Sequence, residues 1–502
     1  MARIFLTTTI PYVNAPPHLG HVLEFVQADV LARHHRQRGD EVRLLTGTDD
    51  NSLKSVLAAQ AAGVGVQEWV DRHADAIAAL RGPLALSYDD FIRTSSDKRH
   101  AAGVERLWRA CAAAGDLYPA RYEGLYCVGC ESYYPPGDLV DGRCPEHGTQ
   151  PDRLAEDNWF FRLSRYERPL REAIASGRLR IEPASRRNEV LALIDGGLRD
   201  FSISRTRERA RGWGVGVPDD PDQVVYVWWD ALGNYVTSLD YGTDGDAFRY
   251  WWQAADRRVH LLGKGVLRFH AVYWPAMLLS AGLPLPTDLL VHDYLTIDGR
   301  KISKSSGGGA DPVALVDRFG TDAVRWWLLR EVPRSGDADF TVTRLVERAN
   351  ADLAGGFGNL VNRVVTMVHR YRGGYVPAAE SGVDADLDHA CAQAPAQVDA
   401  ALAEADFRRA CAAVWRIVEA ANRCIERERP WQLARAEHAG DPAAGDRLDA
   451  VLAALVSACR TLGERLRPLL PDAAGAIAGQ CAATDGRLPA PRPLFPRWRA
   501  AR

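Results

Sequence analysis

The first fifty residues alternate between apolar strands and an amphipathic helix. "RIFLTTT" (3–9) is an apolar run typical of a buried strand, and "EVRLLTG" (41–47) is a second one. Between them, "HVLEFVQADVLARHHRQRG" (21–39) has the apolar spacing of a helix that ends at Gly39. A strand, a helix and a strand with short links predict a βαβ unit and a parallel sheet. Ligands of such sheets bind at the carboxyl ends of the strands.

The apolar pattern then lapses and returns much later. Residues from about 115 to 225 are rich in turn-forming residues and carry Cys and His side chains. Strand-like segments follow in "VVYVWWDALGNYV" (224–236), "RVHLLGKGV" (258–266) and "DLLVHDYLTI" (288–297). We therefore expect one nucleotide-binding sheet that is split by an insertion.

The last part of the chain has the spacing of helices. From about residue 346 it is rich in Ala, Leu and Arg, as in "FGNLVNRVVTMVHRYRGG" (357–374) and "RLDAVLAALVSACRTLGERLRPLLP" (447–471). Apolar residues recur there every three or four positions, which predicts packed helices rather than a low-complexity tail. We expect a helical bundle.

Composition narrows the class of protein only a little. The 502 residues are 47% hydrophobic and 25% charged with a net charge of −3, which does not exclude a local basic face for nucleic acid. No apolar run is long enough to span a bilayer, and "MARIFLTTTIPY" lacks the pattern of a signal peptide. Nine cysteines in a chain of this length do not form a disulfide scaffold. We expect no membrane association and a reduced, cytoplasmic compartment.

Two histidines lie where the first helix is expected to begin. In "PYVNAPPHLGHV" (11–22), His18 and His21 flank Leu19 and Gly20. They can be incidental to a helix start. Alternatively, imidazole N–H groups and the unpaired backbone N–H groups of a helix N-terminus bind polyphosphate together, while Gly20 lets a nucleotide approach the backbone closely.

A pair of lysines lies far downstream. "GRKISKSSGGG" (299–309) places Lys301 and Lys304 three residues apart, with hydroxyl residues around them and three glycines behind. A solvated basic turn explains this composition. A loop whose ammonium groups close over a triphosphate explains it as well, because nucleotidyl transfer needs cations where negative charge accumulates.

In this order and on this fold, the two motifs resemble the HIGH and KMSKS signatures of class I aminoacyl-tRNA synthetases. The resemblance implies that ATP binds with Mg²⁺ and that an amino acid carboxylate attacks its α-phosphate. The catalytic residues it implies are His18, His21, Lys301 and Lys304.

Further blocks extend the resemblance over nearly the whole chain. "TTTIPYVNAPPHLGH", "RGDEVRLLTGTD", "YVWWDALGNY", "LRFHAVYWPAML" and "GTDAVRWWLLREV" are similar to methionyl-tRNA synthetases. The methionine site implied by position consists of Ile10, Tyr12, Asp49, Trp228, Ala231, Leu232, Tyr235 and His270. Asp49 would pair with the substrate ammonium group. From residue type alone the aromatic residues would be assigned to the core, although polarizable aromatic surface suits a thioether.

Four metal-ligand residues lie in the expected insertion. "CVGCESYYPPGDLVDGRCPEH" (127–147) contains the pair Cys127 and Cys130 and, after a 13-residue gap, Cys144 and His147. Two turn-forming pairs suit one tetrahedral Zn²⁺, and because protein fills all four positions the metal is expected to be structural. Free thiols or a disulfide are the alternatives. The motif also resembles the one-knuckle form of the synthetase insertion.

The helical part carries the expected contact with tRNA. Asn359 and Arg363 are four residues apart and share a predicted helix face, and Trp431 follows Pro430. A polar helix face and a core tryptophan would explain them. By position they match the anticodon-binding residues of the family, which implies a CAU anticodon. Amide and guanidinium groups can bond to unpaired bases, and an indole can stack on one.

With this resemblance, the predicted fold is α/β: a Rossmann-type parallel sheet split by a zinc-containing insertion and followed by an α-helical bundle. The expected segments are the first half of the catalytic Rossmann domain (1–114), the connective insertion with the zinc knuckle (115–225), the second half of the Rossmann domain (226–290), a stem-contact segment with the KISKS loop (291–345) and a helical anticodon-binding domain (346–502).

The chain departs from the family in two blocks. Where Gly-Thr-Asp-Glu-His-Gly is usual it has "GTDDNS" (47–52), which changes Asp50, Asn51 and Ser52. Asn51 can still donate a hydrogen bond, but unlike histidine it cannot become a cation. Where Gly-Lys-Asp is usual, Gly265 removes a carboxylate expected near the nucleotide ribose.

Three hypotheses follow. The first is a methionine–tRNA ligase, including a divergent second copy. The second is an adenylate-forming ligase that passes methionine or an analogue to a small-molecule acceptor, and the third is a non-catalytic tRNA-binding protein. The catalytic motifs disfavour the third and the anticodon residues disfavour the second. We expect methionine, ATP and tRNA as partners. Because the family's optional C-terminal tRNA-binding domain does not follow the bundle, we also expect a monomer.

Overall fold

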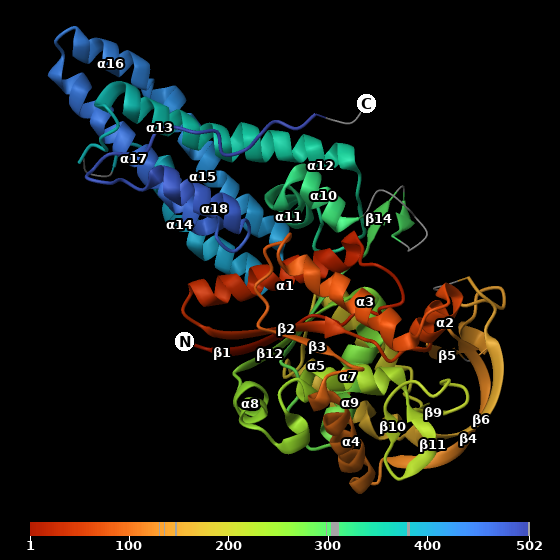
Figure 1. The fold of residues 1–502 in the computed structure, drawn as a ribbon. Helices are drawn as coiled ribbons and strands as arrows, with labels where there is room; N and C mark the ends of the chain where they lie inside the picture. The colour runs from red at the N-terminus through yellow and green to blue at the C-terminus, as the bar shows by residue number, and fades with distance from the viewer. Residues whose placement is uncertain are drawn as a thin grey trace. The chain divides into compact units, whose positions relative to one another are not determined.

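The structure is a computed structural model that describes residues 1–129, 131–134, 136–145, 148–297, 299–302, 311–378 and 382–499 (Figure 1). The chain divides into two compact units. The first comprises Met1–Ala28, Arg38–Arg81 and Leu86–Asp293, and the second comprises Asp29–Gln37, Gly82–Ala85 and Tyr294–Arg502.

A six-stranded parallel sheet organises the first unit. Its order is β3 (Asp90–Arg93), β2 (Glu41–Thr48), β1 (Arg3–Thr7), β12 (Arg257–Gly263), β13 (Asp288–His292) and β7 (Arg180–Glu182). Strands β2 and β12 flank β1 on opposite sides, so the direction of winding reverses between β1 and β12. A crevice at the carboxyl ends of these strands is where such sheets bind ligands. The predicted parallel α/β sheet is confirmed.

Helices connect these strands. They are α1 (Leu19–Gln37), α2 (Leu53–Ala62), α3 (Val66–Ala78), α4 (Lys98–Ala113), α5 (Glu167–Ala175), α6 (Ala184–Asp195), α7 (Val227–Thr237), α8 (Asp246–Phe248) and α9 (Trp274–Ser280). The predicted strand–helix–strand start corresponds to β1, α1 and β2. The core of this unit includes the fully buried Trp229, Trp252 and Trp274.

The segment 224–236 is not the strand that its apolar run predicts. Only its first residues extend β11 (Asp220–Val225), and most of it forms helix α7. Ten of the eleven α7 residues are buried, so the helix shows no polar face and therefore no helical period. A fully buried helix cannot be told from a strand by periodicity, and the β-branched and aromatic residues favoured the wrong choice.

The region expected as an insertion forms antiparallel sheets. Strands β4 (Leu117–Cys127) and β6 (Asp152–Phe161) pair along their length, and β5 (Ser132–Tyr134) and β8 (Phe201–Ser202) complete that sheet. A second small sheet consists of β9 (Ser204–Thr206), β10 (Gly216–Val217) and β11. Edge strand β7 of the parallel sheet also comes from this stretch of sequence, so the stretch contributes to both architectures.

The second unit is mainly helical. Besides the short strands β14 (Leu295–Ile297), β15 (Arg300–Lys301) and β16 (Ala338–Asp339), it contains the helices α10 (Pro312–Phe319), α11 (Thr321–Arg330), α12 (Val342–Arg348), α13 (Asn359–Arg372), α14 (Ala385–Ala403), α15 (Phe407–Glu428), α16 (Pro430–His438), α17 (Pro442–Leu466) and α18 (Pro471–Cys481). The two segments that were quoted for their helical spacing contain α13 and most of α17. In the described part of the chain, no helix is both long and apolar enough to cross a bilayer.

Candidate active site

The first helix of the parallel sheet begins with the two predicted histidines. The rings of His18 and His21 stack with centroids 3.8 Å apart. The Nδ1 atom of His18 accepts from the backbone N–H of Gly20 at 3.1 Å, and Nδ1 of His21 accepts from the N–H of His18 at 3.3 Å. A neutral imidazole that accepts at Nδ1 carries its proton on Nε2, so in the neutral form each ring has its N–H at Nε2, next to the helix N-terminus. A Cβ on Gly20 would lie 3.0 Å from the His18 ring, which is why glycine fits here.

Asp49 follows strand β2 at the carboxyl edge of the sheet. Its side chain is 2% exposed, and its Oδ1 has no hydrogen-bond partner among the described residues. Burial raises the pKa of Asp49 well above its ordinary value, and the nearby carboxylates of Asp230, Asp50 and Glu131 raise it further. Ionising this group therefore requires an added positive charge, which a substrate ammonium supplies.

Aromatic rings lie next to this carboxylate. Tyr12 forms an isolated parallel bridge with Asp49 and packs edge-on against Trp228, at 6.2 Å between centroids. Trp228 stacks on Phe269 at 3.7 Å, and the ammonium of Lys54 lies 4.6 Å from the centre of the Tyr12 ring. The Tyr12 hydroxyl is buried without a hydrogen-bond partner among the described residues. Ile10 packs against the same core.

Helix α7 contributes a second wall. Ala231, Leu232 and Tyr235 lie on it and are almost fully buried. The Tyr235 hydroxyl is 2.7 Å from Nε2 of His270, and Nδ1 of His270 is 2.9 Å from the Val266 carbonyl oxygen. Burial lowers the pKa of His270 to about 4, so at neutral pH the ring is uncharged, donates from Nδ1 and accepts from Tyr235 at Nε2. The predicted methionine-site residues thus form two linked groups, Tyr12–Asp49–Trp228 and Tyr235–His270.

The three residues at 50–52, which differ from the usual family sequence, each form side-chain hydrogen bonds. Asp50 accepts from the Ser95 hydroxyl at 2.6 Å, and Ser52 is the N-cap of α2, where its hydroxyl accepts from the Ser55 N–H. A serine N-cap stabilises a helix by about 1 kcal/mol. Asn51 donates to Asp230 at 2.7 Å. These substitutions are therefore integrated into the local hydrogen bonding.

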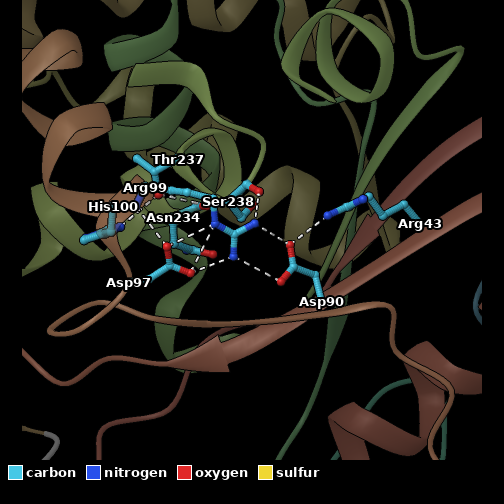
Figure 2. Close-up of polar contacts among 8 residues, drawn as sticks. All are labelled: Arg43, Asp90, Asp97, Arg99, His100, Asn234, Thr237 and Ser238. Atoms are coloured by element: carbon cyan, nitrogen blue, oxygen red, sulfur yellow. Dashed lines mark hydrogen bonds and ion pairs between the residues drawn. The ribbon is translucent and has the colours of Figure 1, made fainter. Parts of the chain in front are cut away.

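A polar network behind the site joins strand β3 to helices α4 and α7 (Figure 2). Arg99 lies between Asp90 and Asp97, at 2.9 and 2.6 Å, and also donates to the Ser238 carbonyl oxygen at 2.7 Å. The two carboxylates raise the pKa of Arg99 further, so its charge is permanent. Because Ser238 ends α7, this network fixes the helix that carries Ala231, Leu232 and Tyr235.

A second polar group spans the strands beside the winding reversal. Glu24 on α1 accepts from both the N–H and the hydroxyl of Thr9, at 2.6 and 2.5 Å, and lies 3.0 Å from Nε2 of His292 at the end of β13. Although burial lowers it, the pKa of His292 is raised overall by Glu24. A Cβ on Gly263, at the end of β12, would lie 3.3 Å from the His292 ring.

Gly265 lacks the carboxylate that the family usually has there, but an acidic residue follows the next strand of the sheet. Asp293 follows β13, is buried, and lies 3.6 Å from the ammonium of Lys264 while also pairing with Arg186. The carboxyl edge therefore keeps an acidic side chain one strand away from Gly265.

Part of the predicted zinc and lysine sites lies outside the described residues. Cys130, His147 and Lys304 belong to those positions, and the side chain of Lys301 does as well. Cys127 and Cys144 are described and buried, and both contact Thr149: the Cys127 thiol is 3.8 Å from its hydroxyl, and the Cys144 N–H donates to its carbonyl oxygen. No cluster of three metal ligands occurs within the described ranges.

The predicted anticodon residues meet in the second unit. Asn359 begins α13 and is exposed, and Arg363 lies one turn later on the same helix. The Arg363 guanidinium is 5.8 Å from the centre of the Trp431 ring, and Trp431 is 36% exposed at the start of α16. An exposed indole beside a guanidinium suits base stacking.

Sequence reasoning missed four residues at the carboxyl edge: Glu24, Phe269, His292 and Asp293. Glu24 looked like an ordinary polar position of an amphipathic helix, and Phe269 looked like core. His292 and Asp293 end a strand-like run at the edge where ligands bind, which is a signal that could have found them.

Comparisons with known proteins agree with this arrangement. The family described as "tRNA synthetases class I (M)" matches residues 4–155 and 136–365. The methionine–tRNA ligase of Mycobacterium tuberculosis is 40% identical over 99% of this chain and 98% of its own length. That of Caldanaerobacter subterraneus is 40% identical over 93% of this chain and 72% of its own.

Solved structures give the same result. Mycobacterium tuberculosis methionyl-tRNA synthetase in complex with methionyl-adenylate superposes with a TM-score of 0.93 at 38% identity, covering 99% of this chain and all of that one. Its free form gives 0.86 at 35% identity, covering all of this chain and 99% of that one. The chain belongs to the methionyl-tRNA synthetase family of class I aminoacyl-tRNA synthetases.

Proposed function

We propose that the chain is a methionine–tRNA ligase that forms methionyl-adenylate from methionine and ATP and transfers the methionyl group to the 3′-terminal adenosine of a tRNA with a CAU anticodon. The observation that carries this is Asp49, a buried carboxylate whose Oδ1 has no hydrogen-bond partner among the described residues and which lies beside aromatic rings at the ligand edge of the sheet. This is the environment that an amino acid with an apolar side chain requires.

In the first step, a methionine carboxylate oxygen attacks the α-phosphorus of ATP and the bond to pyrophosphate breaks. The Asp49 carboxylate binds the substrate ammonium, and Tyr12, Trp228 and the α7 wall enclose its side chain. The ATP enters as its Mg²⁺ complex, and its phosphates receive hydrogen bonds from Nε2–H of His18 and His21. Lys301 and Lys304 supply positive charge to the leaving pyrophosphate; the support for them is their match to the family motif.

In the second step, a hydroxyl of the terminal adenosine attacks the adenylate carbonyl, and AMP leaves with the bonding electrons of the broken C–O bond. The anticodon is bound in the helical unit by Asn359, Arg363 and Trp431. The partly buried Arg363 guanidinium beside the exposed Trp431 indole supports this assignment, because one side chain can pair with base edges while the other stacks.

A structural Zn²⁺ bound by Cys127, Cys130, Cys144 and His147 is part of the proposal. Its support is the ligand spacing together with the two described thiols, which are buried and share Thr149 as a neighbour. Such a metal cross-links two turns and takes no part in catalysis. Elemental analysis of the purified chain should find about one zinc per chain, and Cys144→Ser should lose it and lower the melting temperature. Retention of zinc by that variant contradicts the assignment.

A cytoplasmic monomer completes the proposal. The described cysteines form no disulfide with one another, which suits a reducing compartment. The small-molecule ligase is not favoured, because relatives matched over nearly the whole chain are methionine–tRNA ligases.

Amino-acid-dependent ATP–pyrophosphate exchange, followed by tRNA charging, tests the function. With a panel of amino acids, exchange is expected to be strongest with methionine, and a CAU-anticodon tRNA should then be charged. Exchange with another amino acid, or exchange without charging of that tRNA, contradicts the proposal.

A further inference from the structure

Asn51 is the one residue of the segment 48–52 that reaches the surface. Thr48, Asp49, Asp50 and Ser52 are all buried, whereas Asn51 is partly exposed. Its backbone N–H lowers the pKa of the nearby Asp49 carboxyl, against the larger effect of burial. The partly exposed side chain of Asn51 therefore lies between solvent and the buried acidic residues Asp49 and Asp230.

The two hydrogen bonds of the Asn51 amide fix its orientation. Nδ2 donates to Oδ2 of Asp230 at 2.7 Å and to the carbonyl oxygen of Thr94 at 3.2 Å. Both partners are acceptors, and an amide nitrogen has two hydrogens. Because both hydrogens are used, the amide cannot flip without placing its oxygen against two other oxygens. Oδ1 must therefore point away from Asp230 and Thr94.

Asp230 is itself held from behind. Its Oδ1 hydrogen-bonds to Nε2 of His100 on α4, and both side chains are almost completely buried. Nδ1 of His100 lies 2.8 Å from the hydroxyl of Thr237 at the end of α7 (Figure 2). A continuous chain of hydrogen bonds thus runs from the buried ends of two helices to the Asn51 amide.

The two carboxylates near Asn51 are acceptors. Asp49 Oδ1 has no partner among the described residues, and Asp230 is the acidic side chain that raises the pKa of Asp49 most. An ammonium group has three donors and suits such a set of acceptors. A neutral amide at position 51, in contrast to a protonated imidazole, leaves the negative field of Asp49 and Asp230 for the substrate.

We propose that His100 and Asp230 are positioning residues that hold the Asn51 carbonyl oxygen toward the substrate, where it accepts a hydrogen bond from the methionine ammonium beside Asp49. This assignment rests on the proposed function of the chain. Asn51, where the family usually has histidine, still donates hydrogen bonds as expected, to Asp230 and Thr94, and its carbonyl oxygen serves the substrate as an acceptor.

Asp230→Asn tests the orientation directly. In this variant the amide oxygen at position 230 still accepts from the His100 N–H, and the amide nitrogen turns toward Asn51. The Asn51 amide must then flip, so that its oxygen accepts from position 230. Its NH₂ group then faces the substrate. The methionine KM in ATP–pyrophosphate exchange is expected to rise about tenfold or more, because a charge-assisted hydrogen bond is replaced by two opposed donors, while the ATP KM changes less than about twofold.

Asn51→Asp is tested both alone and in combination with Asp230→Asn, and the combination is expected to restore methionine binding. Alone, it places two carboxylates against each other and should also raise the methionine KM about tenfold. Combined with Asp230→Asn, the donor and acceptor are exchanged and the hydrogen bond between residues 51 and 230 re-forms, so an acceptor again faces the substrate, although the Thr94 carbonyl oxygen loses its Asn51 donor. The double variant should return to within about threefold of the wild-type KM. Asn188→Asp, at an exposed asparagine, is the matched control and should have no effect.

Calorimetric titration with L-methionine separates this inference from the proposed function. It is done on the wild type, the two single variants at positions 51 and 230, and the double variant. A wild type that binds methionine without catalysing exchange contradicts the function, and the affinities then test the positioning. A double variant no better than the worse single variant overturns the inference, as does an equal rise in the KM values for methionine and ATP. The inference is also overturned if Asp230→Asn has the same methionine KM or the same affinity for methionine as the wild type.

Discussion

Asp29 and Asp49 both have carboxylates with almost no exposure to solvent, but they differ in the charge of the side chains around them. In the helical unit, Oδ2 of Asp29 lies 2.8 Å from Nε of Arg33 and 2.8 Å from Nη2 of Arg325. In the sheet unit, the side chains that shift the pKa of Asp49 are three further acids, and its Oδ1 lacks a partner among the described residues.

The difference separates structure from function. Arg325 also donates to three carbonyl oxygens, those of Leu84, Pro468 and Leu469, so the charge pair around Asp29 is complete without any ligand. The group around Asp49 is complete only when a cation is added. A buried charge with its partner in the chain supports the fold, and one without suggests a substrate of opposite charge.

Arg325→Leu should have the largest effect. The substitution removes one of the two arginines that pair with Asp29, and it removes the Arg325 donor from three carbonyl oxygens. The free energy of unfolding, measured by chemical denaturation, should therefore fall by about 3–5 kcal/mol. Arg168→Leu removes an exposed pair with Glu172 and should change it by less than about 0.5 kcal/mol. Equal effects of the two substitutions would show that the buried pair is not a support of the fold.

Asp49→Asn should give the opposite pattern. The isosteric amide removes an uncompensated charge, so the melting temperature should stay the same or rise. The kcat/KM for methionine in exchange should fall about 100-fold, since the charge that binds the ammonium is gone. A methionine KM within about twofold of the wild-type value contradicts the role of Asp49.

Asp322 is an intermediate case. Burial raises its pKa to about 7, Asp472 adds to this, and Arg325 opposes it. The folded state thus binds this proton more tightly than the unfolded state, where the pKa is near its ordinary value, so stability is lost as pH rises from about 4 to 7. Because a pKa raised by about 3 units corresponds to about 4 kcal/mol, Asp322→Asn should be more stable than wild type by up to about 4 kcal/mol at pH 8, with a smaller difference at pH 5. A difference that does not grow with pH in thermal melting would show that Asp322 does not titrate in this way.

Trp431→Ala should have the smallest effect and a different target. Loss of one stacking surface should raise the tRNA KM in aminoacylation about tenfold and leave methionine-dependent exchange unchanged. Tyr250→Ala removes a similarly exposed aromatic from the sheet unit and should change neither. If Trp431→Ala lowers exchange as much as charging, the division of labour between the units is wrong.

Much of the fold could be predicted from local patterns. The first βαβ unit was predictable because β1 is a continuous apolar run and α1 ends at Gly39. Helix α7 was not, since burial on all sides erases its period, and the pairing of β7 with β13 depends on contacts distant in sequence. Local patterns give elements, whereas tertiary pairing decides their neighbours.

The site divides in the same way. His18 and Gly20 could be identified because a helix start, two imidazoles and a glycine are local. That Asp49 Oδ1 has no partner within the described ranges could not be predicted, because it depends on which acids the fold brings together. The orientation of Asn51 likewise requires Asp230, which is 179 residues away in sequence.

The central claim is that the acidic pocket around Asp49 binds the ammonium of methionine. Calorimetric titration of L-methionine into the wild type and Asp49→Asn tests it most directly. Because burial raises the pKa of Asp49, the wild-type affinity should increase as pH rises through that pKa, and Asp49→Asn should bind at least about 100-fold more weakly with no such dependence. Equal affinity of the two proteins for methionine would contradict the account.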